Sequence, residues 1–301
     1  MTLEDALKEF LYEKEVNGIN ANSIDNYRKT ISYMVRFIGS NIPVSALTLD
    51  SVRKYIMNLN KRDISRSTRS SYIRNIRIFL LWLDEEEGLS FNPRKVKVPR
   101  PAKKNVRIYS DEDIRQIFEK ATTSVLWITK RNQAVIALML DSGLRQGEIC
   151  SLQKEDIQWD TKRIKVTGKG AKDRLVPLGV FSEFCLKEYL KYCPFTDNTY
   201  VFCGRRGEML SGNAIRLFMS RLEKRLGFQL SSHKLRHNFA TNYCSDRYKK
   251  TGETGVYDLS ILMGHESIDT TRRYEHFAHE LLASEHCLSH LDSVFFKDFV
   301  S

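Results

Sequence analysis

A basic, proline-rich segment divides this chain of 301 residues into two parts. Residues 93–107 contain Pro93, Pro99 and Pro101 together with seven lysines or arginines, and they include no acidic residue. Because proline removes a backbone donor and favours extended chain, no regular helix is expected to run through this segment. The sequence predicts a stiff linker, which either follows a phosphate backbone or serves as a solvated tether. A chain of this length favours two domains, each able to bury its own core.

Residues 1–92 carry apolar side chains at helical spacing. After a first helix, the stretch Asn20-Ala21-Asn22-Ser23 offers an N-cap for a second one. A third, short helix is expected at 52–59 and a fourth at about 67–87, so the sequence predicts an all-helical N-terminal domain. The side chains expected to face inward from the fourth helix are Ile73, Ile76, Leu80 and Leu83.

The predicted fourth helix also carries four arginines among serines and a tyrosine. A charged run of this kind is most often a solvated helix face. Guanidinium and hydroxyl groups together also suit contacts with phosphate oxygens, and the whole chain is basic, with a formal net charge of +11. We therefore favour a surface that faces DNA. Its expected members are Arg66, Arg69, Arg74 and Arg77.

The second part of the chain mixes helices with one hairpin. A helix is expected to begin at Ser110, which is followed by three acidic residues, and a strongly apolar helix is expected at 132–140. Residues 163–166 and 175–178 alternate as strands around a loop that contains two glycines. Further helices are expected at 181–192, at 212–226 and over most of the chain from His233 onward. The fold class predicted is therefore mainly α, with a small antiparallel sheet in the second domain.

Composition narrows the class of partner and the compartment. The net charge and a pI near 9.3 indicate a polyanionic partner. No apolar run approaches the roughly 20 residues that span a bilayer, and no signal-peptide core precedes the first helix. Six cysteines occur without a CxxC pair or zinc-ligand spacing, so we expect reduced, mostly structural thiols in the cytoplasm and no metal or cofactor.

Two cationic positions in the second part are candidates for binding a phosphate. Arg145 follows a glycine break and has Glu148 three residues later, which is either a surface ion pair or a guanidinium fork steadied by a carboxylate. Lys169 lies between Gly168 and Gly170 at the predicted hairpin tip, where a lysine is usually solvated. In a phosphoryl-transfer site it could instead protonate a leaving alkoxide, a role for which Lys172 could compete.

The region from residue 233 to residue 274 contains two histidine motifs and a tyrosine. His233 and His237 have the spacing of two metal ligands on one helix face, but the glutamate of HExxH is absent and Arg236 would sit beside the ion, so a metal is not expected. Tyr274 belongs to an apolar helical stripe and on that ground is a core residue. Its separation of nine residues from His265, and its two neighbouring arginines, argue for chemistry instead.

Taken in order, these motifs resemble those of the tyrosine recombinase (lambda-integrase-like) family, in particular its Xer-like and transposon integrase branch. The resemblance covers residues 100–285 closely and the N-terminal helices more loosely. Each motif is weak alone, whereas all of them in this order are highly specific. The matching elements are Gly143-Leu144-Arg145-Gln146-Gly147-Glu148-Ile149, Gly168-Lys169-Gly170, His233-Lys234-Leu235-Arg236-His237, and Gly264-His265 with Tyr274.

The resemblance implies a role for each of six residues. Tyr274 would be the nucleophile that attacks the scissile phosphate, giving a 3′-phosphotyrosyl link and a free 5′-hydroxyl. Arg145 and Arg236 would hold the non-bridging oxygens with help from His265. Lys169 would protonate the 5′-oxygen, and His233 would assist proton transfer with Tyr274. Lys172 and Arg174 are added as expected DNA contacts.

The resemblance also implies an architecture and an assembly. Residues 1–92 would form a SAM-like domain that binds the core DNA site, 93–107 the linker, 108–285 the catalytic domain, and 286–301 an apolar tail for contact between protomers. The partner would be duplex DNA, bound by a tetramer in the synaptic complex. The function expected is integration, excision or resolution of a mobile element.

Three alternatives stay open from the sequence. They are Xer-type resolution of chromosome or plasmid dimers, a DNA-binding regulator that has lost catalysis, and a type IB topoisomerase. A long polar stretch at 246–255 and the absence of a further arm-binding domain weaken the housekeeping Xer role.

Overall fold

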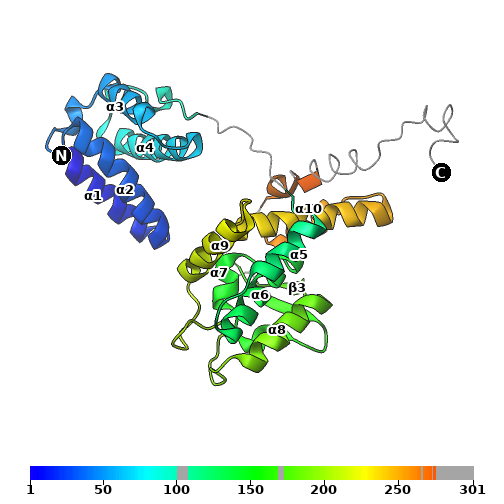
Figure 1. Cartoon of the computed structure of the whole chain (residues 1–301). Coiled ribbons are helices and arrows are strands. Elements are labelled where there is room, and N and C mark those ends of the chain that lie inside the picture. Colours follow the sequence, from blue (N-terminus) through cyan, green and yellow to red (C-terminus); the bar gives the residue numbers. More distant parts are fainter. Residues whose placement is uncertain (100–107, 169–172, 266, 273, 276–301) are drawn as a thin grey trace, which may run out of the picture. The chain divides into compact units, whose positions relative to one another are not determined.

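The computed structural model describes residues 1–99, 108–168, 173–265, 267–272 and 274–275. The chain groups into two compact units, residues 1–105 and residues 106–301, and Figure 1 labels their elements. The helices that the sequence predicted for the N-terminal part, the motif from His233 to His237 and the predicted hairpin all fall within these ranges, apart from the hairpin tip. Lys169, Lys172 and the expected C-terminal tail lie outside the described residues.

The first unit is helical. Its elements are α1 (Leu3–Val16), α2 (Ala21–Ile38), η1 (Val44–Ala46), α3 (Leu49–Lys61), α4 (Arg66–Glu87) and η2 (Pro93–Lys95).

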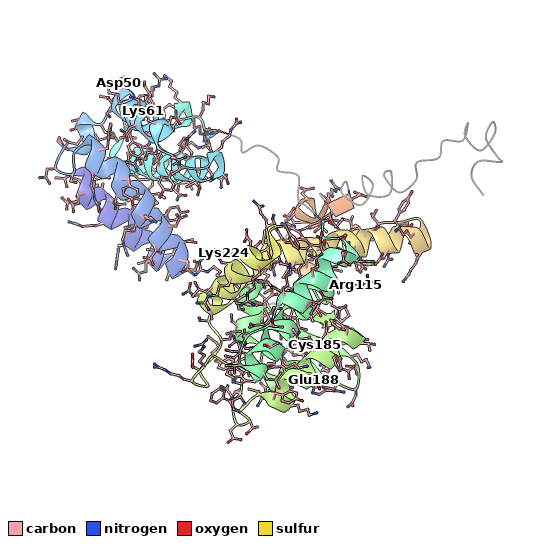
Figure 2. All side chains as sticks on the ribbon, viewed as in Figure 1. Asp50, Lys61, Arg115, Cys185, Glu188 and Lys224 are labelled. Carbon is pink, nitrogen blue, oxygen red and sulfur yellow. The ribbon has the colours of Figure 1, made fainter. Side chains whose placement is uncertain are left out.

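Polar side chains begin each α-helix of this unit. Thr2, Asn20, Thr48 and Ser65 each accept a hydrogen bond from a backbone N–H of the first turn, which satisfies a donor that has no partner within the helix. In α3, Asp50 stands in the first turn and Lys61 in the last (Figure 2), so both charges favour the helix dipole.

An aromatic cluster forms the centre of the first unit. The Phe10 ring meets the Phe79 ring edge to face at 5.3 Å and the Trp82 ring at 5.5 Å, joining α1 to α4. The predicted inward side chains of α4, from Ile73 to Leu83, are all buried. This core confirms the helical prediction for the N-terminal part.

The start of the segment predicted as a linker packs against the first unit. Pro93 and Val96 are buried with its core, and the Ser70 hydroxyl donates to the Pro99 carbonyl at 2.7 Å. Pro93 opens a short 3₁₀ turn, because its fixed φ suits the first position of a helical turn. The extended strap predicted for residues 93–107 therefore does not begin at Pro93, and residues 100–107 are not among those described.

The second unit combines helices with a three-stranded sheet. Its helices are α5 (Asp111–Lys120), α6 (Leu126–Asp141), α7 (Gln146–Ser151), η3 (Lys154–Asp156), α8 (Val180–Tyr192), α9 (Gly212–Leu226), α10 (Ser232–Thr251) and α11 (Val256–Met263). Its strands are β1 (Ile157–Gln158), β2 (Arg163–Thr167) and β3 (Asp173–Pro177).

The sheet is antiparallel in the order β1-β2-β3, and Ile164 lies opposite Val176 in the predicted hairpin. Both of these side chains are buried, while the residues beside them in β2 face solvent, as a half-buried strand requires. The small antiparallel sheet is confirmed, and the two-residue strand β1 adds an edge that the sequence did not predict.

Helix α6 forms the centre of the second unit. Nearly all of its residues from Ala134 to Met139 are fully buried, and α6 packs against α8 and α10. Lys130 of α6 also pairs at 3.0 Å with Glu188 of α8, which is labelled in Figure 2. Because α6 leads directly to Arg145, this rigid helix fixes where the first candidate catalytic side chain begins.

The expectations about membrane-spanning segments and about the cysteines can be compared with the described residues only. Within them, no helix is both long enough and apolar enough to cross a membrane. Five cysteines are described, and all five are free and buried.

Candidate active site

A tight turn after α6 places Arg145. Gly143 has φ +61°, a left-handed conformation that glycine adopts without strain. A Cβ at this position would also lie 2.3 Å from the Phe239 ring, so no larger residue fits without displacing the Phe239 side chain of α10. The turn brings Arg145 to the N-cap of α7 and points the Gly143 carbonyl at Arg236, whose Nη1 donates to it.

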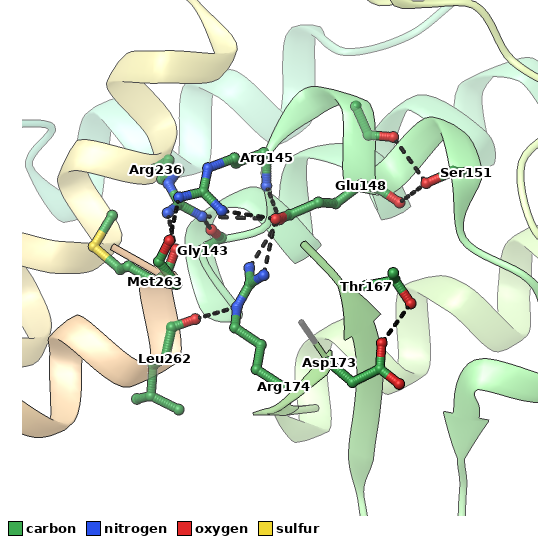
Figure 3. A network of polar contacts seen from close by, with 12 residues as sticks. Gly143, Arg145, Glu148, Ser151, Thr167, Asp173, Arg174, Arg236, Leu262 and Met263 are labelled. Carbon is green, nitrogen blue, oxygen red and sulfur yellow. Dashed lines mark hydrogen bonds and ion pairs between the residues drawn. The ribbon is translucent and has the colours of Figure 1, made fainter. Parts of the chain in front are cut away.

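The buried carboxylate of Glu148 binds both Arg145 and Arg174 (Figure 3). Glu148 accepts from the Arg145 backbone N–H at 2.7 Å and from Arg145 Nη1 at 2.8 Å. Arg174, at the start of β3, donates from both terminal nitrogens to the same carboxylate, each at 2.9 Å. The Glu148 and Arg174 side chains are each 8% exposed. The sequence interpretation of Glu148 as a group that steadies Arg145 agrees with this geometry.

Burial and hydrogen bonding act in opposite directions on Glu148. Burial raises the pKa of its carboxyl, but the hydrogen bonds and charge of Arg174, with the hydrogen bonds from Arg145, outweigh it and hold the pKa below its usual value. The carboxylate is therefore ionised at neutral pH. An ionised carboxylate has acceptor sites for all four of these hydrogen bonds, two at each oxygen, and protonation of either oxygen would remove one of them.

Arg236 completes a group of three arginines around Glu148. It lies on α10, is 4% exposed, and its Nη1 is 4.0 Å from Glu148 Oε2. Burial and the nearby positive charge of Arg145 lower the pKa of Arg236 to about 10, against the attraction of Glu148. At neutral pH all three guanidinium groups are charged and share a single carboxylate, which leaves excess positive charge for an anion.

The same three arginines hold the C-terminal end of α11. Arg174 Nε donates to the Leu262 carbonyl at 2.7 Å, Arg236 Nη2 to the Met263 carbonyl at 2.5 Å, and Arg145 Nη2 to the Gly264 carbonyl at 2.8 Å. Carbonyls in the last turn of a helix have no partner within the helix, and the dipole there favours positive charge. The segment that leads to His265 is thus fixed by the cluster itself.

Tyr274 lies beside this cluster and is buried. Its side chain is 1% exposed, and a 2.5 Å hydrogen bond joins its hydroxyl to His237 Nδ1. The His265 ring is nearly parallel to the Tyr274 ring, with centroids 6.5 Å apart, and His265 Nδ1 is 2.8 Å from the Thr271 hydroxyl. His233 is on the exposed side of α10, and its ring meets the His237 ring at 4.5 Å.

The structure therefore brings together five of the six residues expected to be catalytic. Arg145, Arg236, His265 and Tyr274 lie within one network of contacts, and His233 joins it through the ring of His237. The sixth, Lys169, lies outside the described residues.

Two observations were not predicted. Arg174, expected to contact DNA, uses its side chain inside the protein on Glu148 and Leu262. His237 was weighed only as a metal ligand, and it binds the Tyr274 hydroxyl instead. Its position four residues after His233, on the same helix face, was the only signal in the sequence.

The expected DNA-facing arginines are in the first unit. Arg66 and Arg74 of α4 are exposed, whereas Arg69 and Arg77 are partly buried. Arg69 Nη2 lies 3.5 Å from the carbonyls of Arg62 and Ile64, where it helps to hold the turn that precedes α4.

The ion pairs of Glu148 predict a defined pH dependence of stability. Since its folded-state pKa is below the usual value of 4.5, its stabilising contribution is complete above that pH and is lost as the pH falls through the folded pKa. Glu148→Gln should lower the free energy of unfolding at pH 7 by about 3 kcal/mol, because the arginines lose their buried counter-charge. Below pH 4.5 the difference from the native protein should shrink.

Urea denaturation between pH 3.5 and 7 measures this difference. The matched control is Glu155→Gln, an exposed glutamate of the same unit, which should change the free energy of unfolding by less than about 0.5 kcal/mol. A difference between native protein and Glu148→Gln that does not vary with pH would contradict the assignment.

Comparisons with known proteins agree with this arrangement. Residues 107–280 match the model of the phage integrase family, and residues 2–81 match the phage integrase SAM-like domain. The chain is 26% identical over 292 residues to tyrosine recombinase XerC of Xanthomonas campestris, covering 95% of this chain and 88% of that protein. It is 27% identical over 280 residues to XerC of Oceanobacillus iheyensis, covering 89% and 90%.

Solved structures share the fold. The integrase of transposon Tn1549, in complex with a circular intermediate DNA, superposes with a TM-score of 0.73 at 16% identity, covering 91% of this chain and 94% of that chain. The site-specific recombinase XerH bound to its difH substrate gives a TM-score of 0.73 at 20% identity, covering 94% and 83%. Since the family model spans more than half of its residues, the chain belongs to the phage integrase family, and it is a site-specific DNA recombinase of the tyrosine type.

Proposed function

We propose that this recombinase cuts and rejoins duplex DNA with Tyr274 as the nucleophile. One observation carries the proposal: Arg145 and Arg236, from different helices, converge on the carbonyls of residues 263 and 264, directly before His265 and in the segment that leads to Tyr274. A tyrosine beside this much uncompensated positive charge is suited to attack a phosphodiester.

The chemistry needs this charge. A tyrosine hydroxyl with a pKa of about 10 is a weak nucleophile at neutral pH. As its oxygen bonds to phosphorus and the bond to the 5′-oxygen breaks, negative charge gathers on the phosphoryl oxygens. Preorganised donors such as Arg145 and Arg236 stabilise that charge, and the loss of one donor typically slows a reaction about 10²- to 10³-fold.

Two protons must move during the cleavage step. The proton of Tyr274 is taken up with the help of His233, and Lys169 gives a proton to the departing 5′-oxygen. The 3′-phosphotyrosyl ester retains the energy of the broken bond. Attack by a 5′-hydroxyl can therefore rejoin the strand, and the phenol is regenerated without ATP.

A DNA phosphate would compete with protein carbonyls for the same arginines. Arg145 is 39% exposed in its side chain and donates to a neutral peptide oxygen. A charged phosphate oxygen accepts a stronger hydrogen bond than a carbonyl does. Binding of DNA would thus displace the residue 263 and 264 carbonyls and loosen the segment that follows them.

Such loosening is required, because Tyr274 cannot reach DNA from its present position. The side chain is 1% exposed and its hydroxyl is bonded to His237. The nucleophile must leave this buried position before it can attack. The described arrangement is therefore the state before DNA is engaged.

The substrate that we propose is a duplex recombination site with inverted repeats, because a symmetric assembly of protomers binds symmetry-related half-sites. The biological role we propose is integration, excision or resolution of a mobile element, in the cytoplasm. Similarity to the integrase of transposon Tn1549 supports it. Resolution of chromosome or plasmid dimers is the second candidate, favoured by the XerC proteins that match along nearly the whole chain.

Covalent trapping tests the nucleophile. Sites are first selected from random duplexes with the Tyr274→Phe protein, and a nicked version of a selected site is then incubated with each protein. The native protein should form an adduct that survives denaturation. Tyr274→Phe should form none, while its DNA affinity stays within about twofold, because only the attacking oxygen is removed.

The control for this experiment is Tyr257→Phe, at a tyrosine of α11 that is 69% exposed, which should form the adduct normally. An adduct with Tyr274→Phe would refute the nucleophile. Selected sites bound by the native protein without any adduct would favour a regulator, and joining of two sites would exclude a topoisomerase.

A modified leaving group tests the role of Lys169. Lys169→Ala should cleave ordinary DNA at least about 100-fold more slowly. If the bridging 5′-oxygen is replaced by sulfur, the leaving thiolate needs no proton, and the rate should return to within about threefold of the native rate. Lys172→Ala is the matched variant. If the sulfur substrate restores the cleavage rate of Lys172→Ala but not that of Lys169→Ala, Lys172 is the proton donor.

The tetramer is tested by removing the apolar tail. Deletion of residues 288–301 should leave binding to a single site within about twofold but abolish pairing of two sites, because Phe295, Phe296 and Phe299 would supply the contact between protomers. Analytical ultracentrifugation of the DNA complexes measures the assembly. Unchanged recombination by the shortened protein would contradict the proposal.

A further inference from the structure

The side chain of Gln146, the first residue of α7, bonds to the first residues of α9 and α10. Gln146 begins α7, and its Nε2 donates to the carbonyl of Gly212, which begins α9, at 2.8 Å. The hydroxyl of Ser232, which begins α10, donates to Gln146 Oε1 at 3.0 Å. One amide therefore connects three helix N-termini that are far apart in the sequence.

The orientation of this amide is fixed by its partners. A backbone carbonyl can only accept, so the NH₂ group of Gln146 must face Gly212. The oxygen is then left to face the Ser232 hydroxyl. Because both ends of the amide are used, Gln146 cannot turn without losing a hydrogen bond at each end.

The close approach to α9 depends on a glycine. A Cβ at position 212 would lie 2.7 Å from Gln146 Nε2, so any larger residue there would push the amide away. The chain thus has the one residue type at this position that leaves room for the contact.

Two of these three helices, α7 and α10, begin beside a side chain that is expected to be catalytic. Arg145 directly precedes Gln146, and His233 directly follows Ser232. Arg145 is held independently by Glu148. His233 is an exposed residue in the first turn of α10, and the Ser232–Gln146 hydrogen bond joins this turn to α7.

We infer that Gln146 is a positioning residue for the recombination reaction. Through its hydrogen bond with Ser232 it fixes the position of His233 relative to Arg145, and its hydrogen bond to Gly212 of α9 holds the amide in place. The inference rests on the proposed function, since it concerns the group that assists proton transfer from Tyr274. A misplacement of about 1 Å in such a group can slow a reaction as much as 100-fold. Gln146 acts on the cleavage step and not on the affinity for DNA.

The test removes the amide and keeps the length of the side chain. Gln146→Met should lower the single-turnover rate of adduct formation at saturating DNA about tenfold, while the affinity for DNA stays within twofold. Ser232→Ala should produce a loss of similar size. The double variant should be no slower than Gln146→Met alone, because both changes break the same connection.

Gln116→Met is the matched control. Gln116 is on α5 and bonds only to the exposed Glu112 in the described part of the chain, so its substitution should leave the cleavage rate unchanged. Equal rates for native protein and Gln146→Met would overturn the inference. Parallel losses of DNA affinity and melting temperature, or additive losses in the double variant, would equally overturn it, since they would indicate a merely structural role.

A second readout does not depend on activity. The ring resonances of His233, assigned with a His233→Gln variant, should shift in Gln146→Met and in Ser232→Ala but not in Gln116→Met. If the native protein forms no adduct, the proposed function fails while these resonances still decide whether Gln146 sets the position of His233. Unshifted His233 resonances would overturn the inference.

Discussion

The site depends on one buried carboxylate among three guanidinium groups. Without Glu148, the mutual repulsion of Arg145, Arg174 and Arg236, of which the last two are buried, would oppose folding. With Glu148 in place, the arginines stay charged and converge on one point. Their total positive charge is still larger than the single negative charge of the carboxylate. A single carboxylate thus stabilises the folded cluster without neutralising it, and the positive charge that remains is what binding a phosphate requires.

Much of this site could be predicted from the order of the motifs. The glycine break before Arg145 and the acid three residues later specify a capped helix start, and both follow from local geometry. The inward direction of Arg174 could not be predicted in the same way. Its partner is 26 residues away, and only the hairpin that carries it decides that it faces Glu148 and not solvent. The choice of His237 as the partner of Tyr274 likewise depends on how α10 packs against the segment after α11 that carries Tyr274.

The fold shows the same division between local and distant causes. Helices with capping residues and an apolar face were predictable, as was the β2–β3 hairpin with its alternating pattern. The packing of Val96 was not, because three prolines nearby indicated an extended segment and the core that receives Val96 is built by residues far earlier in the chain. The strand β1 was also missed, since two residues are too few to show a period.

The ion pair between Arg174 and Glu148 has a mechanical consequence for the hairpin. It joins the start of β3 to α7 through both terminal guanidinium nitrogens, so this end of the β2–β3 hairpin is fixed in place. Lys169 is five residues before this anchor, and a fully extended chain of that length spans no more than about 18 Å. If Lys169 is the proton donor that we propose, its reach is limited by this length of chain, counted from an arginine bonded to the same carboxylate that organises the cluster.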